Sequence, residues 1–258
     1  MMDAGLVELL RCPRTGQALT LDRDASSLSA LNEQVADGRL GLASGELLDR
    51  PLEAVLRSAD QTTRYPVAAG IAYLLAESAL VVPTGATQST GTVSDAEIQR
   101  QQMAKYSEIY EDWTGGEDGV ARAIQKVLHG RYGQLLAGAT VLDVGNGGTP
   151  AQAQYGAEIA QTLKHFIAAD KSSHMLRRSG PFGDLVLADA FGLPFKDAAV
   201  DFVTVNNTIH HFGRRRGQAP LEKMRSFFDE ALRVAQRGVV GVELLVPAAG
   251  EVAEKLLL

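Results

Sequence analysis

The stretch that most constrains the fold is residues 139–149, where a short apolar run is followed at once by glycines. The apolar part is rich in β-branched residues and contains one acidic residue, Asp143. A buried parallel strand has this composition, and glycines directly after it let the backbone turn sharply and approach a ligand. Thr149 can cap the helix expected next, with Pro150 in its first turn. We therefore expect a strand, a glycine loop and a helix, with a ligand at the carboxyl end of the strand.

Three further apolar runs follow in the chain, and each one ends at a polar residue. They are 166–169 followed by Asp170, 185–188 followed by Asp189, and 200–205 followed by Asn206. A glycine loop alone is also typical of a structural turn, but four such runs in order favour a binding site. Asp170 lies about twenty to thirty residues after the glycine loop, where an acidic side chain can accept hydrogen bonds from a ribose diol.

From about residue 96 onward these motifs resemble class I S-adenosylmethionine-dependent methyltransferases of the small-molecule, Methyltransferase-11-like type. The family motif acidic-x-Gly-x-Gly-x-Gly is matched by Asp143, Gly145 and Gly147, with Thr149 in place of the last glycine. The other matching segments are 170–176, 188–190 with 193–195, and 206–212. The resemblance implies an α/β fold with a Rossmann-like doubly wound sheet, and S-adenosyl-L-methionine as the cofactor.

The resemblance also implies a role for each matching position. Asp143 orients the loop or reaches the methionine amino group, Asp170 accepts from the ribose hydroxyls, and Asp189 accepts from the adenine amino group. Ala190 offers a backbone amide to the adenine ring, and Asn206 lies near the sulfonium. This cofactor has no pyrophosphate, so the loop need not form a phosphate nest. The full expected cofactor set is Asp143, Gly145, Asn146, Gly147, Asp170, Lys171, Met175, Asp189, Ala190 and Asn206.

Methyl transfer is expected to proceed by in-line displacement, to which an enzyme mainly contributes proximity and alignment. An oxygen acceptor needs a base, and His210 and His211 are the candidates because imidazole titrates near neutral pH. The alternative is that a histidine here packs or caps the turn after the fourth strand. A carbon or nitrogen acceptor can react without a base. We expect no metal site, since these histidines with Asp189 and Asp201 make a poor ligand set.

Residues 1–80 are expected to form a separate, small α+β domain. Its start, with Cys12 followed by proline, and its end, with Tyr-Pro-Val and Gly-Ile-Ala-Tyr-Leu-Leu, resemble a zinc-ribbon-like domain. That domain activates some tRNA and protein methyltransferases and is also fused to bacterial ones. Thr15 stands in place of its second cysteine, and Cys12 is the one cysteine of the chain. Four soft ligands cannot be assembled, so we predict no zinc, with Cys12 as a small buried residue.

Local patterns subdivide this N-terminal segment. A helix is expected from residue 6, a turn at 11–16, and strands at 19–21, 64–67 and 70–75. In the charged insert 24–60 the apolar spacing predicts helices that cover the small core. The residues that carry this spacing are Leu28, Leu31 and Val35, then Leu47, Leu48, Leu52, Val55 and Leu56.

Residues 81–95 are expected to be a linker, because small polar residues dominate this stretch. The methyltransferase-like domain then spans 96–258. Its first helix carries Tyr106, Tyr110 and Trp113, which either form a lid over cofactor and acceptor or pack the helix on the sheet. A second helix, 119–136, leads into the first strand.

The C-terminal part departs from the family pattern. A long helix is expected from Pro220 to about Val234, then a fifth strand at 239–246 and a further helix at 248–258. Five strands are clear, but the last two of the family's usual seven, an antiparallel hairpin, are not found. Either the chain is truncated, or a homo-oligomer or other partner covers the open edge beside strand five, or the fold does without them.

The composition is that of a globular cytoplasmic protein. Its 258 residues are 45% hydrophobic and carry a net charge of −6. This balance argues against tight nucleic-acid binding, which usually needs a basic surface. We find no apolar stretch of bilayer length and no secretion signal, so no membrane partner is expected.

Three functional interpretations follow. The leading one is methyl transfer to a small-molecule acceptor, as in secondary metabolism, supported by the acidic composition and the aromatic segment. The second is methylation of rRNA or tRNA, suggested by the N-terminal domain and opposed by the net charge and the missing cysteines. The third is a non-catalytic partner subunit, suggested by the replaced third glycine and the missing last strands.

Overall fold

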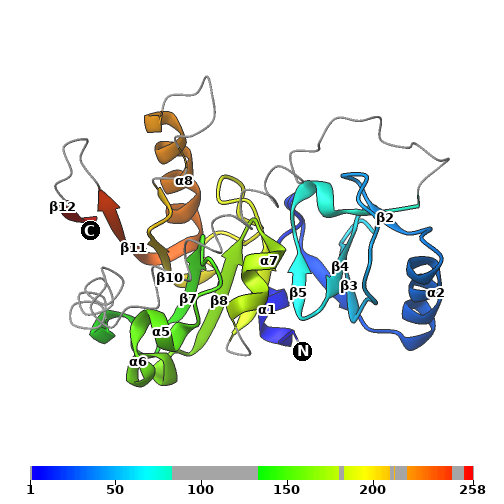
Figure 1. Cartoon of the computed structure of the whole chain (residues 1–258), viewed down its shortest axis with the longest axis horizontal. Helices are drawn as coiled ribbons and strands as arrows, with labels where there is room; N and C mark the ends of the chain where they lie inside the picture. Colours follow the sequence, from blue (N-terminus) through cyan, green and yellow to red (C-terminus); the bar gives the residue numbers. More distant parts are fainter. Residues whose placement is uncertain are drawn as a thin grey trace.

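The computed structural model of this protein describes residues 2–82, 133–179, 183–209, 212, 220–245 and 253–257. Within these residues one large sheet organises the molecule (Figure 1). Its ten strands are, in spatial order, β1 (Leu19–Asp22), β3 (Ala54–Ser58), β4 (Arg64–Ala68), β5 (Ile71–Tyr73), β9 (Asp184–Leu187), β8 (His165–Asp170), β7 (Thr140–Val144), β10 (Val200–Asn206), β11 (Ala235–Leu245) and β12 (Ala253–Leu257).

The central strands are parallel and doubly wound, as the sequence predicts. From β7 the chain steps outward through β8 to β9, then returns to the other side of β7 to form β10 and β11. The pairs β9·β8, β8·β7, β7·β10 and β10·β11 are all parallel. The strand order therefore reverses between β7 and β10, and ligands bind at the carboxyl edge beside such a reversal.

Helices cover both faces of this parallel part. On one face, Phe227 of α8 (Pro220–Val234) belongs to the same buried cluster as Leu142 of β7. On the other face, Tyr155 of α5 (Ala151–Tyr155) packs in a second cluster with Val141 of the same strand. The short helices α6 (Ala157–Thr162), α7 (Ser173–Leu176) and η2 (Arg177–Ser179) complete the connections. Neighbouring residues of β7 thus point to opposite faces, and both faces are buried.

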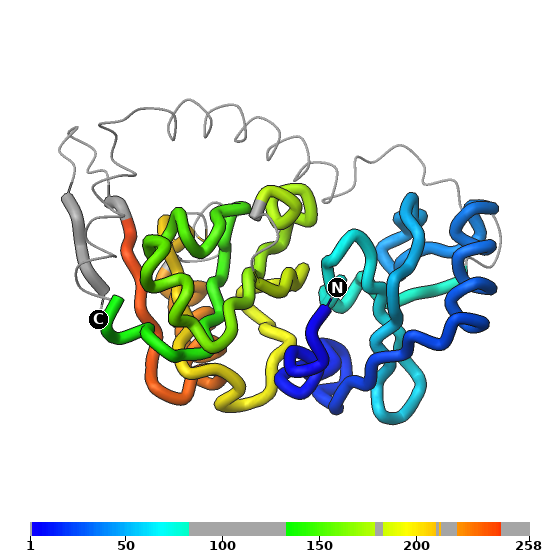
Figure 2. The backbone as a smooth tube through the Cα atoms, turned by 90° about the horizontal axis from the view of Figure 1, so that it is seen from below, coloured from blue at the N-terminus to red at the C-terminus, as the bar shows by residue number. Residues whose placement is uncertain are grey.

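The N-terminal segment extends the same sheet. Strands β1, β3, β4 and β5 pair antiparallel in that order, and β5 then pairs in parallel with β9 through Ala72 and Val186. Figure 2 shows the two parts of the chain side by side. Leu6 and Tyr65 also belong to the buried cluster that contains Val186. The sheet and core are therefore continuous across residue 80, and a separate N-terminal domain stays a prediction.

Most of the expected N-terminal elements are present. Helix α1 (Ala4–Leu9) begins at Asp3, whose carboxylate accepts from Gly5 N, and β1, β4 and β5 lie where strands are predicted. Helix α2 (Ala25–Ala36) confirms the first helix of the insert. The remaining elements are β2 (Gly41–Leu42) paired with β6 (Leu80–Val81), and η1 (Ala76–Ser78). Cys12 is buried as predicted, with Sγ 3.7 Å from Tyr65 Oη.

The second predicted helix of the insert is wrong. Residues 47–52 contain no helix, and 54–58 form β3. Val55 packs with Leu31 of α2 on one side of this strand, whereas Ala54 and Leu56 face the main core on the other. A strand buried on both faces has apolar residues at consecutive positions, so its spacing cannot be distinguished from that of a buried helix.

The C-terminal part needs another correction. Helix α8 has the predicted bounds, but β11 begins directly after it and is longer than expected. The stretch expected to be a final helix instead contains β12, which pairs antiparallel with β11 from Gly241 to Leu245. Alanine, glutamate, lysine and leucine favour a helix, yet pairing with the exposed edge of β11 overrides that weak preference. One antiparallel strand thus lies where the sequence predicts an open edge.

Other expectations fall outside the described residues. They concern nearly all of the linker, the aromatic segment with Tyr106, Tyr110 and Trp113, and most of the helix leading to β7, of which the described end, 133–136, is helical. None of the helices that the structure describes is long and apolar enough to cross a membrane.

Candidate active site

The loop after β7 needs glycine for two separate reasons. Gly145, Gly147 and Gly148 have φ of +70°, +63° and +80°, which side-chain-bearing residues rarely adopt. A Cβ on Gly145 would lie 2.2 Å from Thr208 Cγ2, and one on Gly148 would lie 2.4 Å from the carbonyl oxygen of Met175. The loop is therefore wedged between the turn after β10 and helix α7. Gly148 occupies a variable position of the motif, yet it is as tightly enclosed as Gly145.

The backbone N–H groups of this fully described loop all donate within the protein. In chain order, Gly145 N and Asn146 N donate to Ala169 O (2.9 and 3.2 Å), Gly147 N to Asp170 Oδ2 (3.0 Å), Gly148 N to Asn146 Oδ1 (3.1 Å) and Thr149 N to Asn146 O (3.2 Å). Loops that bind phosphate point such groups at the ligand. This loop has used its donors, so a pyrophosphate would find no cradle here.

The helix that follows starts differently from the prediction. Pro150 is the N-cap of α5 and no side chain caps the helix, so Thr149 does not have the expected role. Instead, Asn146 Nδ2 donates to Thr149 O at 2.8 Å and to Asp143 Oδ2 at 2.7 Å. Asn146 thus holds the loop closed from its centre.

Asp143 lies inside the protein, below the loop. Its carboxylate accepts from Gln154 Nε2 at 3.0 Å and from Thr204 Oγ1 at 2.8 Å, in addition to Asn146. Tyr155 Oη, at 3.3 Å, is a longer contact. Burial raises the pKa of Asp143 to about 6, against the lowering effect of these hydrogen bonds. Such complete enclosure favours the loop-orienting role over direct contact with a ligand.

Asp170 ends β8 and faces the glycine loop. Oδ2 accepts from Gly147 N at 3.0 Å, and Oδ1 accepts from Ser172 N at 2.8 Å. Burial raises the pKa of Asp170, and the hydrogen bond from Ser172 N opposes that effect. An ionised carboxylate has about four acceptor positions, so Gly147 N and Ser172 N do not use all of them. Met175 of α7 is buried beside the loop.

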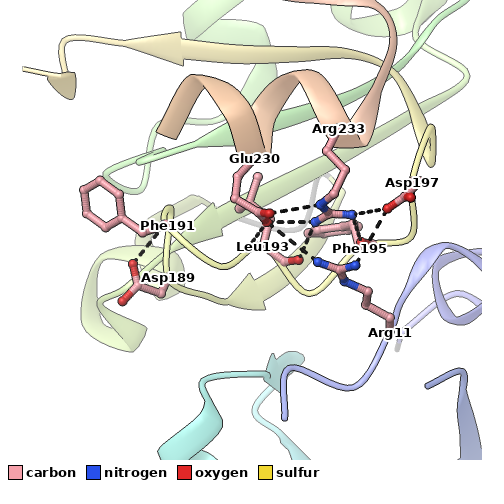
Figure 3. A network of polar contacts seen from close by, with 8 residues as sticks. All are labelled: Arg11, Asp189, Phe191, Leu193, Phe195, Asp197, Glu230 and Arg233. Carbon is pink, nitrogen blue, oxygen red and sulfur yellow. Dashed lines mark hydrogen bonds and ion pairs between the residues drawn. The ribbon is translucent and has the colours of Figure 1, made fainter. Parts of the chain in front are cut away.

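Asp189 lies just after β9, next to Asp170 along the sheet edge. Oδ2 accepts from Lys171 Nζ at 2.9 Å, so the expected cofactor residue Lys171 contacts a neighbouring carboxylate. Oδ1 accepts from Phe191 N at 3.1 Å (Figure 3), and Asp189 O accepts from Gly192 N at 3.1 Å. These bonds fold residues 189–192 into a compact turn, which we call the adenine-side turn. Its second residue, Ala190, is half-buried.

The end of β10 joins the same network. Asn206 Nδ2 lies 3.4 Å from Asp143 Oδ1, and Asn206 Oδ1 accepts from Val242 N at 3.3 Å. Buried Glu243 of β11 accepts from Thr208 N and Ile209 N, at 3.1 and 2.8 Å. Glu243 was not expected in the site, although a lone acidic residue in the apolar run 239–246 is a signal for it.

Sequence reasoning also missed Gln154, Tyr155, Thr204 and Thr208. Thr204 meets Asp143 because the two are partners in the β10·β7 register, and register across a crossover is not visible in a sequence. His210 and His211, the expected bases, lie outside the described residues. Their neighbours Ile209 and Phe212 are both buried.

The expected side chains therefore gather at one edge of the sheet. Asp170, Asp189 and Asn206 come from the ends of β8, β9 and β10, around the loop that follows β7. Carboxylates here suit hydroxyl, amino and cationic groups, whereas the loop excludes phosphate recognition. Within the part of the chain that the structure describes, no group of three or more His, Cys, Asp or Glu is placed to hold a metal ion. The fold is an α/β domain with a doubly wound sheet, and its site offers carboxylate acceptors without a backbone cradle for a pyrophosphate.

Comparison with known families agrees with this class. Residues 142–242 match the model of the methyltransferase domain family. They form a class I methyltransferase domain, and S-adenosylmethionine is the cofactor of that class. No curated protein matches the sequence significantly.

Several solved structures are similar to parts of the chain. The PH0226 protein of Pyrococcus horikoshii is 20% identical with a TM-score of 0.44, over 56% of this chain and 70% of that one. An S-adenosylmethionine-dependent methyltransferase of Aquifex aeolicus is 21% identical with a TM-score of 0.38, over 55% and 72%. Phosphoethanolamine N-methyltransferase 1 of Haemonchus contortus, solved with phosphoethanolamine and S-adenosylhomocysteine, is 17% identical with a TM-score of 0.36, over 57% and 33%. Further similar chains are covered over 46% to 53% of their length.

Proposed function

We propose that this protein transfers the methyl group of S-adenosylmethionine to a small-molecule acceptor. The observation that carries the proposal is the chemistry of the sheet edge. Its glycine loop has used its backbone donors internally, while two carboxylates face the same edge from neighbouring strands. S-adenosylmethionine presents hydroxyl groups, an amino group and a sulfonium, and it carries no phosphate. The donors of this cofactor match the acceptors of the site.

Three residues have proposed cofactor contacts. Asp170 would accept from the ribose hydroxyls, because its carboxylate lies at the loop and keeps acceptor positions after binding Gly147 N. Asp189 would accept from the adenine amino group, with the backbone amide of Ala190 beside the ring. The glycine loop would pass under the amino-acid end, with Asn206 near the sulfonium. Asp143 would act from below by fixing Asn146 and hence the loop.

When bound, S-adenosylmethionine supplies an electrophilic methyl group to an acceptor aligned with its carbon–sulfur bond. The protein contributes alignment and exclusion of water. For an oxygen acceptor, we propose His210 or His211 as the base that takes its proton. The turn before them is tied to the sheet, since Glu243 accepts from Thr208 N and Ile209 N. A nitrogen or carbon acceptor would not need this base.

A small-molecule acceptor fits the charge of the protein. The net charge of −6 opposes binding to an RNA backbone, whose affinity comes largely from lysine and arginine on phosphates. A secondary metabolite is the class we favour. An RNA acceptor is tested by adding total tRNA and rRNA to the methyl-transfer assay, where labelled RNA would contradict the proposal.

The first test is calorimetric titration of the full chain with S-adenosylhomocysteine. Saturable binding is expected, and Asp170→Ala should weaken it about tenfold or more, which corresponds to about 1.4 kcal/mol. Asp22→Ala is a matched control, because Asp22 also ends a strand and accepts from the amide two residues on, at 2.9 Å. Equal affinities for wild type and Asp170→Ala would overturn the proposed ribose contact. No binding to wild type would overturn the enzyme function in this form.

A further inference from the structure

The segment that follows the adenine-side turn is held from both sides. This connecting segment (residues 193–197) runs between α8 and the N-terminal segment, and its backbone groups bond to residues outside it. The bonds are Leu193 N to Glu230 Oε2 (3.0 Å), Arg233 Nη2 to Leu193 O (3.1 Å), Arg11 N to Pro194 O (3.0 Å), Arg233 Nη1 to Phe195 O (2.8 Å) and Lys196 N to Leu9 O (2.8 Å).

One ion pair on α8 supplies three of these five bonds. Arg233 donates to both carboxylate oxygens of Glu230, at 3.0 and 2.8 Å, and also to Asp197 at 2.7 Å (Figure 3). A planar guanidinium with five donors can bind carboxylates and carbonyls at once, which an ammonium group cannot do in the same geometry. Burial acts to raise the pKa of Glu230, but the hydrogen bonds from Arg233 bring that pKa below its usual value. The pair is therefore ionised at neutral pH.

The N-terminal segment meets the same pair. Arg11 Nη2 lies 3.8 Å from Glu230 Oε2, and its Nη1 lies 3.7 Å from Asp197 Oδ1. Leu10 forms an antiparallel bridge with Phe195, which is fully buried. Arg11 thus approaches the connecting segment and the Glu230–Arg233 pair from the side opposite to α8.

These contacts fix the far end of the adenine-side turn. Its near end is fixed by the sheet, since Ala188 N donates to Asp170 O at 2.9 Å. Its far end is Gly192, whose next residue is Leu193, bound through both N and O to Glu230 and Arg233. The turn itself closes through Asp189, as described above. The backbone of the turn that carries Asp189 is therefore anchored at both ends, at one end on β8 and at the other on α8.

We propose that Arg233 and Glu230 are positioning residues that hold the adenine-side turn and thereby set affinity and base preference for the adenosyl group. The inference rests on the proposed function, because it requires Asp189 to accept from the adenine amino group. Neither side chain touches the cofactor in this proposal. Both act through the backbone of Leu193, and Arg11 supports them from the N-terminal segment.

The test compares two ligands on the full-length protein. S-adenosylhomocysteine has the adenine amino group, whereas S-inosylhomocysteine has a carbonyl oxygen in its place. Wild type is expected to prefer the adenosyl compound. In Arg233→Met we expect the affinity for the adenosyl compound to fall about tenfold, because Asp189 is displaced. The affinity for the inosyl compound should fall less. The readout is the dissociation constant of the inosyl compound divided by that of the adenosyl compound. A loss of overall stability alone would not change this ratio. The ratio for Arg233→Lys should lie between those of wild type and Arg233→Met, because an ammonium group lacks the planar set of donors of a guanidinium.

Arg57→Met is the matched control. Arg57 of β3 binds Asp22 through two nitrogens, and its side chain is 25% exposed compared with 20% for Arg233. This pair lies between the antiparallel strands β1 and β3, at the end of the sheet that is remote from β8. The control should leave both affinities and their ratio unchanged.

Each outcome decides the inference. A folded Arg233→Met with the wild-type ratio overturns it, while binding by wild type keeps the proposed function. If Arg233→Met does not fold, Glu230→Gln and Arg11→Met are measured in the same way, and wild-type ratios in both overturn it. A reduced ratio in either one supports it. If wild type binds neither ligand, the proposed function fails and this inference fails with it.

Discussion

Asp143 is the residue on which the glycine loop depends. Its carboxylate is buried, and its pKa is raised from the usual Asp value to about 6. An acid with a raised pKa in the folded state stabilises the protein fully below its unfolded pKa of about 3.9. That stabilisation is lost as the pH rises through the folded pKa. The contribution of Asp143 to the unfolding free energy therefore decreases as the pH rises from about 4 to about 7.

Asp143→Asn tests this role. The NH₂ group of the new amide would face either Asn146 Nδ2 or the groups that now donate to Oδ1, and donors cannot bond to donors. We therefore expect a loss of about 1–3 kcal/mol in unfolding free energy. The loss should be larger at pH 5 than at pH 7, because only wild type gains from protonation of Asp143. Urea unfolding of both proteins at the two pH values measures the difference. A loss that is independent of pH would contradict the raised pKa.

Gly148 tests the packing of the loop against α7. In Gly148→Ala the new Cβ would meet Met175 O at 2.4 Å with φ at +80°, so loop or helix must move. We expect a destabilisation of about 1–3 kcal/mol, together with weaker S-adenosylhomocysteine binding. Gly192→Ala is the control, because its Cβ would have no atom within 4 Å. Similar unfolding midpoints for the two variants would show that the loop is less confined than the structure indicates.

At the residue scale, the sequence predicts which polar side chains gather but not what they contact. Asp170, Asp189 and Asn206 were located from their positions at strand ends. Thr204, Glu243 and the Glu230–Arg233 pair were missed because their contacts depend on strand register and on how α8 crosses the sheet. The cofactor role of Lys171 stays a prediction, and the structure adds that its Nζ donates to Asp189.

At the element scale, the sequence does not predict the parallel pairing of β5 with β9. Leu74 N donates to Leu187 O at 2.8 Å, and Ile71 is fully buried between the two parts of the sheet. The parallel strands β7, β8, β9 and β10 and the helix α8 lie where the sequence predicts them. The errors at β3 and β12 come from tertiary context: burial on two faces in one, and pairing with an exposed edge in the other.

Hydrogen exchange tests this pairing. We expect the amides of residues 71–74 to be protected to the same degree as those of 184–187, because opening one strand exposes the other. Chemical unfolding of the full chain should then show coincident exchange of both stretches as denaturant is added. Protection of 184–187 that persists after 71–74 has become fully exchangeable would show instead that the N-terminal segment unfolds independently.

At the scale of the whole molecule, the sheet joins the N-terminal segment to the methyltransferase domain. The same N-terminal segment also contacts the connecting segment beside the adenine-side turn through Leu9, Leu10 and Arg11. The N-terminal segment thus adjoins the proposed cofactor site as well as the sheet edge. From this place in the fold we expect the N-terminal segment to support the proposed cofactor site.

The most direct test of the central claim is an experimental structure of the full chain with S-adenosylhomocysteine. We predict that the ribose hydroxyls lie within hydrogen-bonding distance of the Asp170 carboxylate and the adenine amino group within reach of Asp189. The N–H groups of residues 145–149 should keep their partners inside the protein. A ligand bound away from the carboxyl ends of β7, β8 and β9, or a loop that turns its N–H groups toward the ligand, would contradict the account.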